Sequence, residues 1–187
     1  MDERQKRIVA TVVALAEEGG FEAVRLRDVA AHSGVALGTL YRIFRGKDDL
    51  LVAALATEAE GLAERFAKTP PAGDTPLERA TDYFEAATRT LCRKPKLTRA
   101  ILRAASSDDP ELAAKIRAFH VVASGLLMQA LRADPTASLD SATPLEARIC
   151  NVLQMVWFAA MLGWMSGQHK QQEVVEQVRN AAELVLR

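Results

Sequence analysis

Apolar residues recur at helical spacing in the first quarter of the chain. One helical face is formed by Ile8, Val12, Leu15 and Ala16. We expect this helix to end at Gly19-Gly20, because glycine tolerates the left-handed conformation at a helix end. A second helix that stops at Ser33-Gly34 is followed, after three or four residues, by a third from Leu37 to Phe44. The pattern therefore predicts a helix, a tight turn and a helix.

Several later segments carry explicit signals for the start of a helix. Thr75-Pro76-Leu77-Glu78 and Thr143-Pro144-Leu145-Glu146 each combine a Thr N-cap, a Pro at the first helical position and a Glu that completes a capping box. Asp109-Pro110 begins another helix in a similar way. Since no β-strand alternation is present, we predict an all-α chain of about nine helices, with approximate spans 3–18, 27–33, 37–44, 47–67, 76–93, 96–106, 110–133, 144–168 and 171–186.

Composition indicates an ordinary folded protein. The chain has 187 residues, of which 49% are hydrophobic and 26% charged, so it can bury a substantial core and fits no disordered or disulfide-stapled class. Cys92 and Cys150 lie in apolar helical patterns, where a free cysteine usually packs as a small hydrophobic residue. The start does not resemble a signal peptide, and the longest apolar run, 152–165, is too short to cross a hydrocarbon core of about 30 Å. We therefore expect a cytoplasmic protein without a membrane partner.

The charge distribution and the third helix point to nucleic acid. The formal net charge is zero, but residues 25–47 contain five cations and one anion. On the third helix Leu40 and Phe44 share an inward face, whereas Gly38, Thr39 and Arg42 point outward. A major groove accepts such a helix, and glycine allows close approach. Spacing alone leaves open an ordinary exposed helix face with solvated side chains.

The segment "RLRDVAAHSGVALGTLYRIFRGKDDLL" resembles the TetR family of bacterial transcriptional regulators, whose helix-turn-helix ends in a similar "GTLYxxFxxK" pattern. The resemblance implies an all-α homodimer in which the first three helices bind operator DNA and the others bind a small ligand and the partner subunit. The positions that match the family's DNA-facing sites are Arg27, Leu37, Gly38, Thr39, Tyr41, Arg42 and Lys47. Two departures stand out. Ile43 replaces a common His that contacts phosphate, and Arg25-Leu26 replaces a common Ser or Thr cap.

From the pattern and this resemblance together we expect two domains. Residues 1–46 would form the helix-turn-helix DNA-binding domain, and residues 47–187 a helical ligand-binding and dimerisation domain. The helix predicted at 144–168 is apolar nearly all round, so it must be covered on more than one side. With the last helix it would form a four-helix bundle with a second copy, for which we predict interface contacts from Leu153, Trp164, Val174, Val178, Ala182 and Val185. The alternative is a monomer in which both helices are core.

An apolar ligand is the expected effector. Adaptable Met and flat aromatic side chains suit such a ligand, and the predicted pocket residues are Phe84, Ile101, Phe119, Met128, Trp157 and Met161. Each of them taken alone is more often an ordinary core residue. "TPLERA", "RKPKLTRAILRA" and "VWFAAMLGWM" are loosely similar to the TetR branch that represses cholesterol and steroid catabolism in actinobacteria, so a steroid, a fatty acid or an acyl-CoA is implied. The cations between Arg93 and Arg103 would then bind ligand phosphates or simply form a solvated helix edge.

Enzymatic chemistry is not expected. There is no phosphate-binding glycine loop, nucleophile elbow or pairing of His with carboxylate, and the three histidines lack metal-like spacing. We therefore predict a repressor without cofactor or metal that binds a palindromic operator as a dimer and is released by its ligand. The alternative from another class is a dimeric ligand-binding or interaction protein that does not bind DNA.

Overall fold

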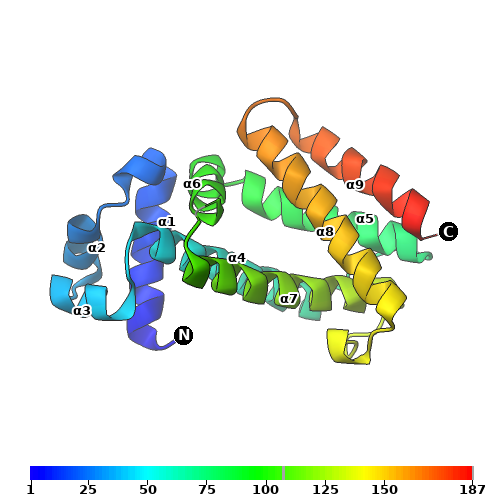
Figure 1. Cartoon of the computed structure of the whole chain (residues 1–187), viewed down its shortest axis with the longest axis horizontal. Helices are drawn as coiled ribbons and strands as arrows, with labels where there is room; N and C mark the ends of the chain where they lie inside the picture. The colour runs from blue at the N-terminus through cyan, green and yellow to red at the C-terminus, as the bar shows by residue number, and fades with distance from the viewer. Residues whose placement is uncertain (107, 187) are drawn as a thin grey trace. The chain divides into compact units, whose positions relative to one another are not determined.

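The computed structural model describes residues 1–106 and 108–186, and within these residues the chain forms nine α-helices and no strand (Figure 1). The all-α prediction is confirmed. The helices are α1 (Glu3–Ala23), α2 (Leu26–Ser33), α3 (Leu37–Ile43), α4 (Lys47–Lys68), α5 (Pro76–Cys92), α6 (Pro95–Ala105), α7 (Pro110–Arg132), α8 (Pro144–Met165) and α9 (Gln171–Val185). A short 3-10 helix (Leu139–Ser141), which the sequence pattern did not predict, precedes α8.

The helix starts follow the capping signals in the sequence. Thr75 and Thr143 accept hydrogen bonds from the backbone N–H groups of Glu78 and Glu146, and both complete the expected capping boxes. The end of α1 differs from its prediction. Gly20 takes a positive φ of 67°, as expected of a helix-ending glycine, but the chain then resumes helical turns as far as Ala23.

The chain folds as two compact units. The first contains Met1–Glu58 and the described residues of Lys94–Arg117, and the second contains Ala59–Arg93 and the described residues from Ala118 onward. Helices α4 and α7 therefore contribute residues to both units. The first turns of α4, all of α6 and the first turns of α7 belong to the same unit as the three amino-terminal helices. The division at residues 46 and 47 concerns function and stays a prediction.

The first unit is built on the packing of α1 against α6 and of α2 against α1 and α3. Its core contains Ile8, Val12, Val29, Leu40, Leu50 and Leu97, each at most 1% exposed. The turn between α2 and α3 depends on Gly34, which has φ 68° and ends α2 in the left-handed conformation. The N–H of Val35 donates to the carbonyl of Ala30 at 3.0 Å, which fixes the direction in which α3 leaves.

The second unit is built on α9, which packs against both α5 and α8, together with the second part of α7. Two buried hydrogen bonds tie the elements together: the Tyr83 hydroxyl donates to the Ala123 carbonyl at 3.0 Å, and Trp157 Nε1 donates to Thr88 Oγ1 at 2.9 Å. The ring centroids of Phe84 and Trp157 are 5.9 Å apart. This unit therefore has an apolar, aromatic-rich core whose few buried polar groups are hydrogen-bonded.

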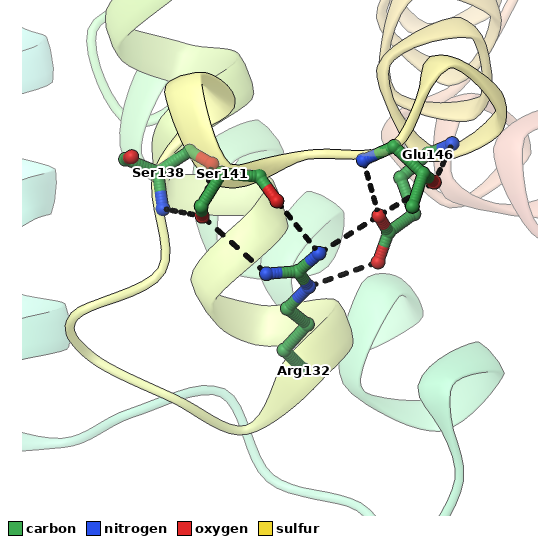
Figure 2. Close-up of polar contacts among 5 residues, drawn as sticks. Arg132, Ser138, Ser141 and Glu146 are labelled. Atoms are coloured by element: carbon green, nitrogen blue, oxygen red, sulfur yellow. Dashed lines mark hydrogen bonds and ion pairs between the residues drawn. The ribbon is translucent and has the colours of Figure 1, made fainter.

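The segment between α7 and α8 is held by Arg132 (Figure 2). Its guanidinium donates two hydrogen bonds to the Glu146 carboxylate, with Nε 2.9 Å from Oε1 and Nη2 2.8 Å from Oε2. Nη2 also donates to the carbonyl of Ser141 at 3.2 Å. Glu146 at the same time accepts from the N–H of Thr143, the residue that caps α8. Arg132 and Thr143 together lower the pKa of Glu146 to about 2 from an ordinary 4.5. The charge on Glu146 therefore stabilises the fold.

We expect Glu146→Gln to lower the Tm at neutral pH, because the variant loses the ionic part of this network. A depressed carboxyl pKa contributes stability that is present above pH 4.5 and is lost as the pH falls toward about 2. The Tm difference between wild type and variant should accordingly shrink through that window when thermal unfolding is followed by circular dichroism. Glu176→Gln, which removes the same charge from an exposed site on α9, is the control. A difference for Glu146→Gln that stays constant from pH 7 to pH 2 would contradict the assignment.

Candidate nucleic-acid interface

Helix α3 exposes Gly38 and Arg42 as its sequence predicts, whereas Thr39, also predicted to point outward, is half-buried. Leu40 is fully buried and Phe44, directly after the helix, is 5% exposed, so both anchor the inner side. Tyr41 is 53% exposed and Arg42 is also exposed. Gly38 is exposed, and a Cβ added there would have no atom within 4 Å. The backbone of α3 can therefore approach another surface closely.

The predicted DNA contacts differ in how accessible they are. Arg27 on α2 and Gly38, Tyr41 and Arg42 on α3 are exposed, whereas Leu37 and Thr39 are half-buried. All six belong to the helix-turn-helix segment of the first unit. The missing cap that the sequence indicated is also seen: Arg25 occupies the N-cap of α2 without a side-chain hydrogen bond to the helix. Ile43 is half-buried and has no polar group to offer a phosphate.

Lys47, the predicted contact at the start of α4, is already engaged within the first unit. Its side chain is 21% exposed, and its Nζ lies 3.8 Å from Glu22 Oε2 and 3.8 Å from the centroid of the Phe21 ring. Burial lowers the pKa of Lys47 despite the opposing charge of Glu22. To reach a phosphate, the ammonium group has to leave Glu22. Lys47 is therefore a more constrained candidate than Arg27 or Arg42.

Three cations of the run around α6 contact carboxylate or carbonyl oxygens of the first unit. Lys94 lies 2.8 Å from Glu58 and 3.4 Å from Glu17. Lys96 donates to the carbonyl of Glu18 at 2.7 Å. Arg103 lies 3.0 Å from Glu22 and its Cζ is 4.0 Å from the centroid of the Phe21 ring. Three of these cations therefore fasten α6 to the carboxyl end of α1 and to α4, a role that the sequence analysis did not consider.

Comparison with known proteins decides the family. Residues 8–54 match the bacterial regulatory proteins of the tetR family, and residues 73–185 match the tetracyclin repressor-like C-terminal domain. The HTH-type transcriptional repressor KstR of Rhodococcus jostii (strain RHA1) is 36% identical over 185 residues, or 98% of this chain and 83% of that protein. The chain belongs to the TetR family.

Solved structures show the same fold. A TetR transcriptional regulator from Rhodococcus sp. RHA1 has a TM-score of 0.86 at 23% identity, covering 98% of this chain and 95% of that one. Thermus thermophilus FadR, a TetR-family repressor in complex with lauroyl-CoA, has a TM-score of 0.75 at 20% identity, covering 97% and 93%. Together with the repressor relatives, this makes the TetR-family chain a DNA-binding transcriptional regulator, which fits the expectation that it is not an enzyme.

The predicted ligand residues of this TetR-family protein belong to both compact units. Phe84, Met128, Trp157 and Met161 are buried in the second unit, and Phe119 is half-buried there. Ile101 is also buried, but it belongs to the first unit. All six residues are buried or half-buried, and their role in ligand binding stays a prediction.

A polar cluster in the second unit was missed as a candidate site. Gln154 is 3% exposed, and its Nε2 donates to Ser124 Oγ at 2.7 Å, while its Oε1 lies 3.2 Å from His120 Nδ1. A signal for it is present in the sequence, because Gln154 interrupts the long apolar run of α8. A buried amide in an otherwise apolar helix needs hydrogen-bond partners, and these come from α7.

The predicted dimer contacts lie mostly inside the chain's own core. Leu153, Val174, Val178 and Ala182 are at most 1% exposed, whereas Trp164 and Val185 are half-buried. A fully buried side chain has no surface left for a partner, so these four positions pack α8 and α9 onto their own unit. The large apolar side chains that the described residues of these helices expose are Leu145, Val152, Met155 and Leu184.

Arg42→Ala tests the α3 face directly. We expect a loss of about 1 to 3 kcal/mol in operator binding and relaxed sequence specificity if Arg42 reads a base, because a specific side chain–base contact carries that much discrimination. If Arg42 holds a phosphate, all sequences should weaken alike. Fluorescence anisotropy with operator and scrambled duplexes separates the two cases. Arg179→Ala on the exposed face of α9 is the matched control, and unchanged binding of every duplex by Arg42→Ala would count against this face.

Proposed function

We propose that this TetR-family protein is a homodimeric repressor that binds a palindromic operator and is released by a small apolar ligand. The observation that carries the proposal is the outward face of α3. It combines an unobstructed Gly38 with exposed Tyr41 and Arg42, on a helix whose other side is anchored by Leu40. A helix with a small residue and polar side chains facing out fits a major groove. Arg27 on α2 supplies a further exposed cation.

The outer surface of α8 supports the dimer. Within the described residues α8 is the one helix long and apolar enough to cross a membrane by length and composition, because it begins at Pro144 and so extends beyond the apolar run of 152–165, which alone is too short. Only 33% of its most apolar window is buried inside the chain. Leu145, Val152 and Met155 are 61%, 42% and 45% exposed, and their spacing of seven and three residues places them on one helical face. A second copy would cover this face. Two reading helices about 34 to 36 Å apart would then require a palindrome-like operator.

The chemistry of the second unit supports an apolar ligand that carries a polar group. Its core combines Met128 and Met161 with Phe84 and Trp157, and flexible or flat side chains adapt to apolar molecules. The Gln154 amide, with its partners Ser124 and His120, would offer hydrogen bonds to a carbonyl or hydroxyl group. We therefore infer a steroid, a fatty acid or an acyl-CoA as the ligand class. The lauroyl-CoA complex of the structurally similar Thermus thermophilus FadR is in line with this class.

Release follows from differential affinity. A ligand lowers DNA affinity only if it binds better to the conformation whose reading helices no longer match two successive grooves. Helix α4 contributes residues to both compact units, and for this reason we propose it as the element that the ligand displaces. The resulting coupling would amount to about 1 to 3 kcal/mol, or five- to 150-fold in operator affinity.

Operator titrations with and without ligand test the release. We expect lauroyl-CoA or a steroid acyl-CoA to weaken operator binding, while free coenzyme A, which lacks the apolar part, leaves it unchanged. A higher salt concentration should weaken operator binding by the ligand-free protein, because phosphate contacts release counterions. Equal operator affinity with every ligand would remove the release mechanism, and no salt-dependent binding of any duplex would favour a ligand-binding protein without DNA.

The dimer is tested by Met155→Glu. Two symmetry-related carboxylates would meet in the proposed interface, and like charges brought together in an interface cost several kcal/mol. We therefore expect the dimer dissociation constant, measured by analytical ultracentrifugation, to rise by about 100-fold or more. Val121→Glu is the control, because Val121 is 59% exposed on α7, outside the proposed face. An unchanged dimer in Met155→Glu, or a monomeric wild type, would refute this interface.

A further inference from the structure

The turn that follows α3 is fastened to the start of α7. Arg45, the first residue after Phe44, directs Nη2 to Asp109 Oδ2 at 2.5 Å and Nη1 to Glu111 Oε2 at 2.6 Å. Asp109 is itself fixed, because its Oδ1 caps α7 by accepting from the N–H groups of Glu111 and Leu112 at 2.8 and 3.2 Å. Arg45 therefore binds one carboxylate, Asp109, that the N-terminus of α7 holds in place, and a second carboxylate, Glu111, on the first turn of α7.

A second contact joins the same two segments. Asp49 on the first turn of α4 accepts a hydrogen bond from the backbone N–H of Arg45 at 3.1 Å. Its side chain is only 4% exposed and pairs with Lys115, one helical turn after Glu111. A buried carboxylate needs such partners. The turn is thus held at Arg45 in two ways. The Arg45 side chain contacts the N-terminus of α7, and the Arg45 backbone N–H donates to Asp49, which pairs with Lys115 on the next turn of α7.

These contacts bear on the orientation of α3. Phe44 is 5% exposed and immediately precedes Arg45, so the position of Arg45 limits how α3 can rotate about its buried side. Arg45 also belongs to the cations that make residues 25–47 basic. The Arg45 charge is already paired with Asp109 and Glu111, so the role of Arg45 differs from that of the exposed cations. The hydrogen bond from Arg45 to Asp109 also raises the pKa of Arg45.

We propose that Arg45 and Asp49 are positioning residues for operator recognition, which clamp the exit of α3 to the first turns of α7, and that Arg45 is not a phosphate contact. This inference rests on the proposed operator binding. The clamp holds the outward face of α3 in the orientation that matches the major groove. Loss of the clamp lowers specific affinity without removing any group that touches DNA.

One double variant distinguishes the clamp from simple electrostatics, because the two explanations predict opposite changes in DNA affinity. Asp109→Asn with Glu111→Gln removes two negative charges, and Asn is as good an N-cap as Asp. If these acids act only through charge, their removal must tighten binding to DNA. The clamp instead requires weaker operator binding, about five- to tenfold, the usual size when residues outside the ligand contacts modulate coupling. Glu18→Gln, at an exposed position on α1, is the control for loss of charge, and we expect it not to weaken DNA binding.

Two further measurements distinguish a positioning role for Arg45 from a phosphate contact. We expect Arg45→Gln to weaken operator binding as much as the acid double variant, and the triple variant to show no additional loss, because groups in one network are not additive. The slope of log affinity against log salt should equal that of wild type. A phosphate contact would instead lower the magnitude of the slope by about 0.9. Tm values and scrambled-duplex affinity, measured alongside, show that the variants fold and bind nonspecifically as wild type does.

The outcomes are distinct for the two proposals. Wild type that binds no duplex would overturn the operator function and, with it, this role for Arg45. Wild type that binds an operator, with an acid double variant that binds equally or more tightly, would overturn the clamp alone. Additive losses, or a reduced salt slope in Arg45→Gln, would likewise overturn it in favour of a direct phosphate contact. If the double variant has a lower Tm, Glu111→Gln alone, at a 68% exposed position, gives the same comparison.

Discussion

The burial of one side of α3 is the constraint on which the DNA-facing surface depends. α3 spans only seven residues, and a helix of this length is not stable by itself in water. Its conformation therefore comes from packing. Leu40 and Phe44 are almost completely buried, and each contributes roughly 1.5 to 3 kcal/mol through the area it removes from water. Because these two side chains fix the rotation of the helix, the opposite side is free to carry residues chosen for recognition.

Charge near the recognition helix is divided between recognition and structure. Residues 25–47 are strongly basic in sequence, but Arg45 is committed to two acids at the start of α7 and Lys47 to Glu22 and Phe21. Arg27 and Arg42 remain exposed. Cations around α6 are used in the same way, since Lys94 and Arg103 contact acids of α1. A basic segment in sequence is therefore not equivalent to a basic surface.

Local signals explain why the helices were predictable and the interfaces were not. Caps such as Thr75 and Thr143 act on their own helix within four residues, so the sequence contains the whole interaction. The identity of the family was likewise carried by one contiguous segment. Hydrophobic periodicity, in contrast, identifies the face of α9 that contains Val174 and Val178, which is the face directed into its own unit. A partner that covers the other face of α9 would be selected by residues that lie far apart in the chain.

The same reasoning explains why the clamp at Arg45 and the cluster at Gln154 appear only in three dimensions. Arg45 and Asp109 are 64 positions apart, and Gln154 and Ser124 are 30 apart. No local pattern pairs such residues, although each is conspicuous in the sequence as an interruption: a cation in a turn and an amide in an apolar helix. Helix α7 contributes partners to both, Asp109 and Lys115 at or near its start in the first unit and Ser124 in the second. Helix α7 therefore carries both sets of partners along one continuous helix, although each set lies within its own compact unit.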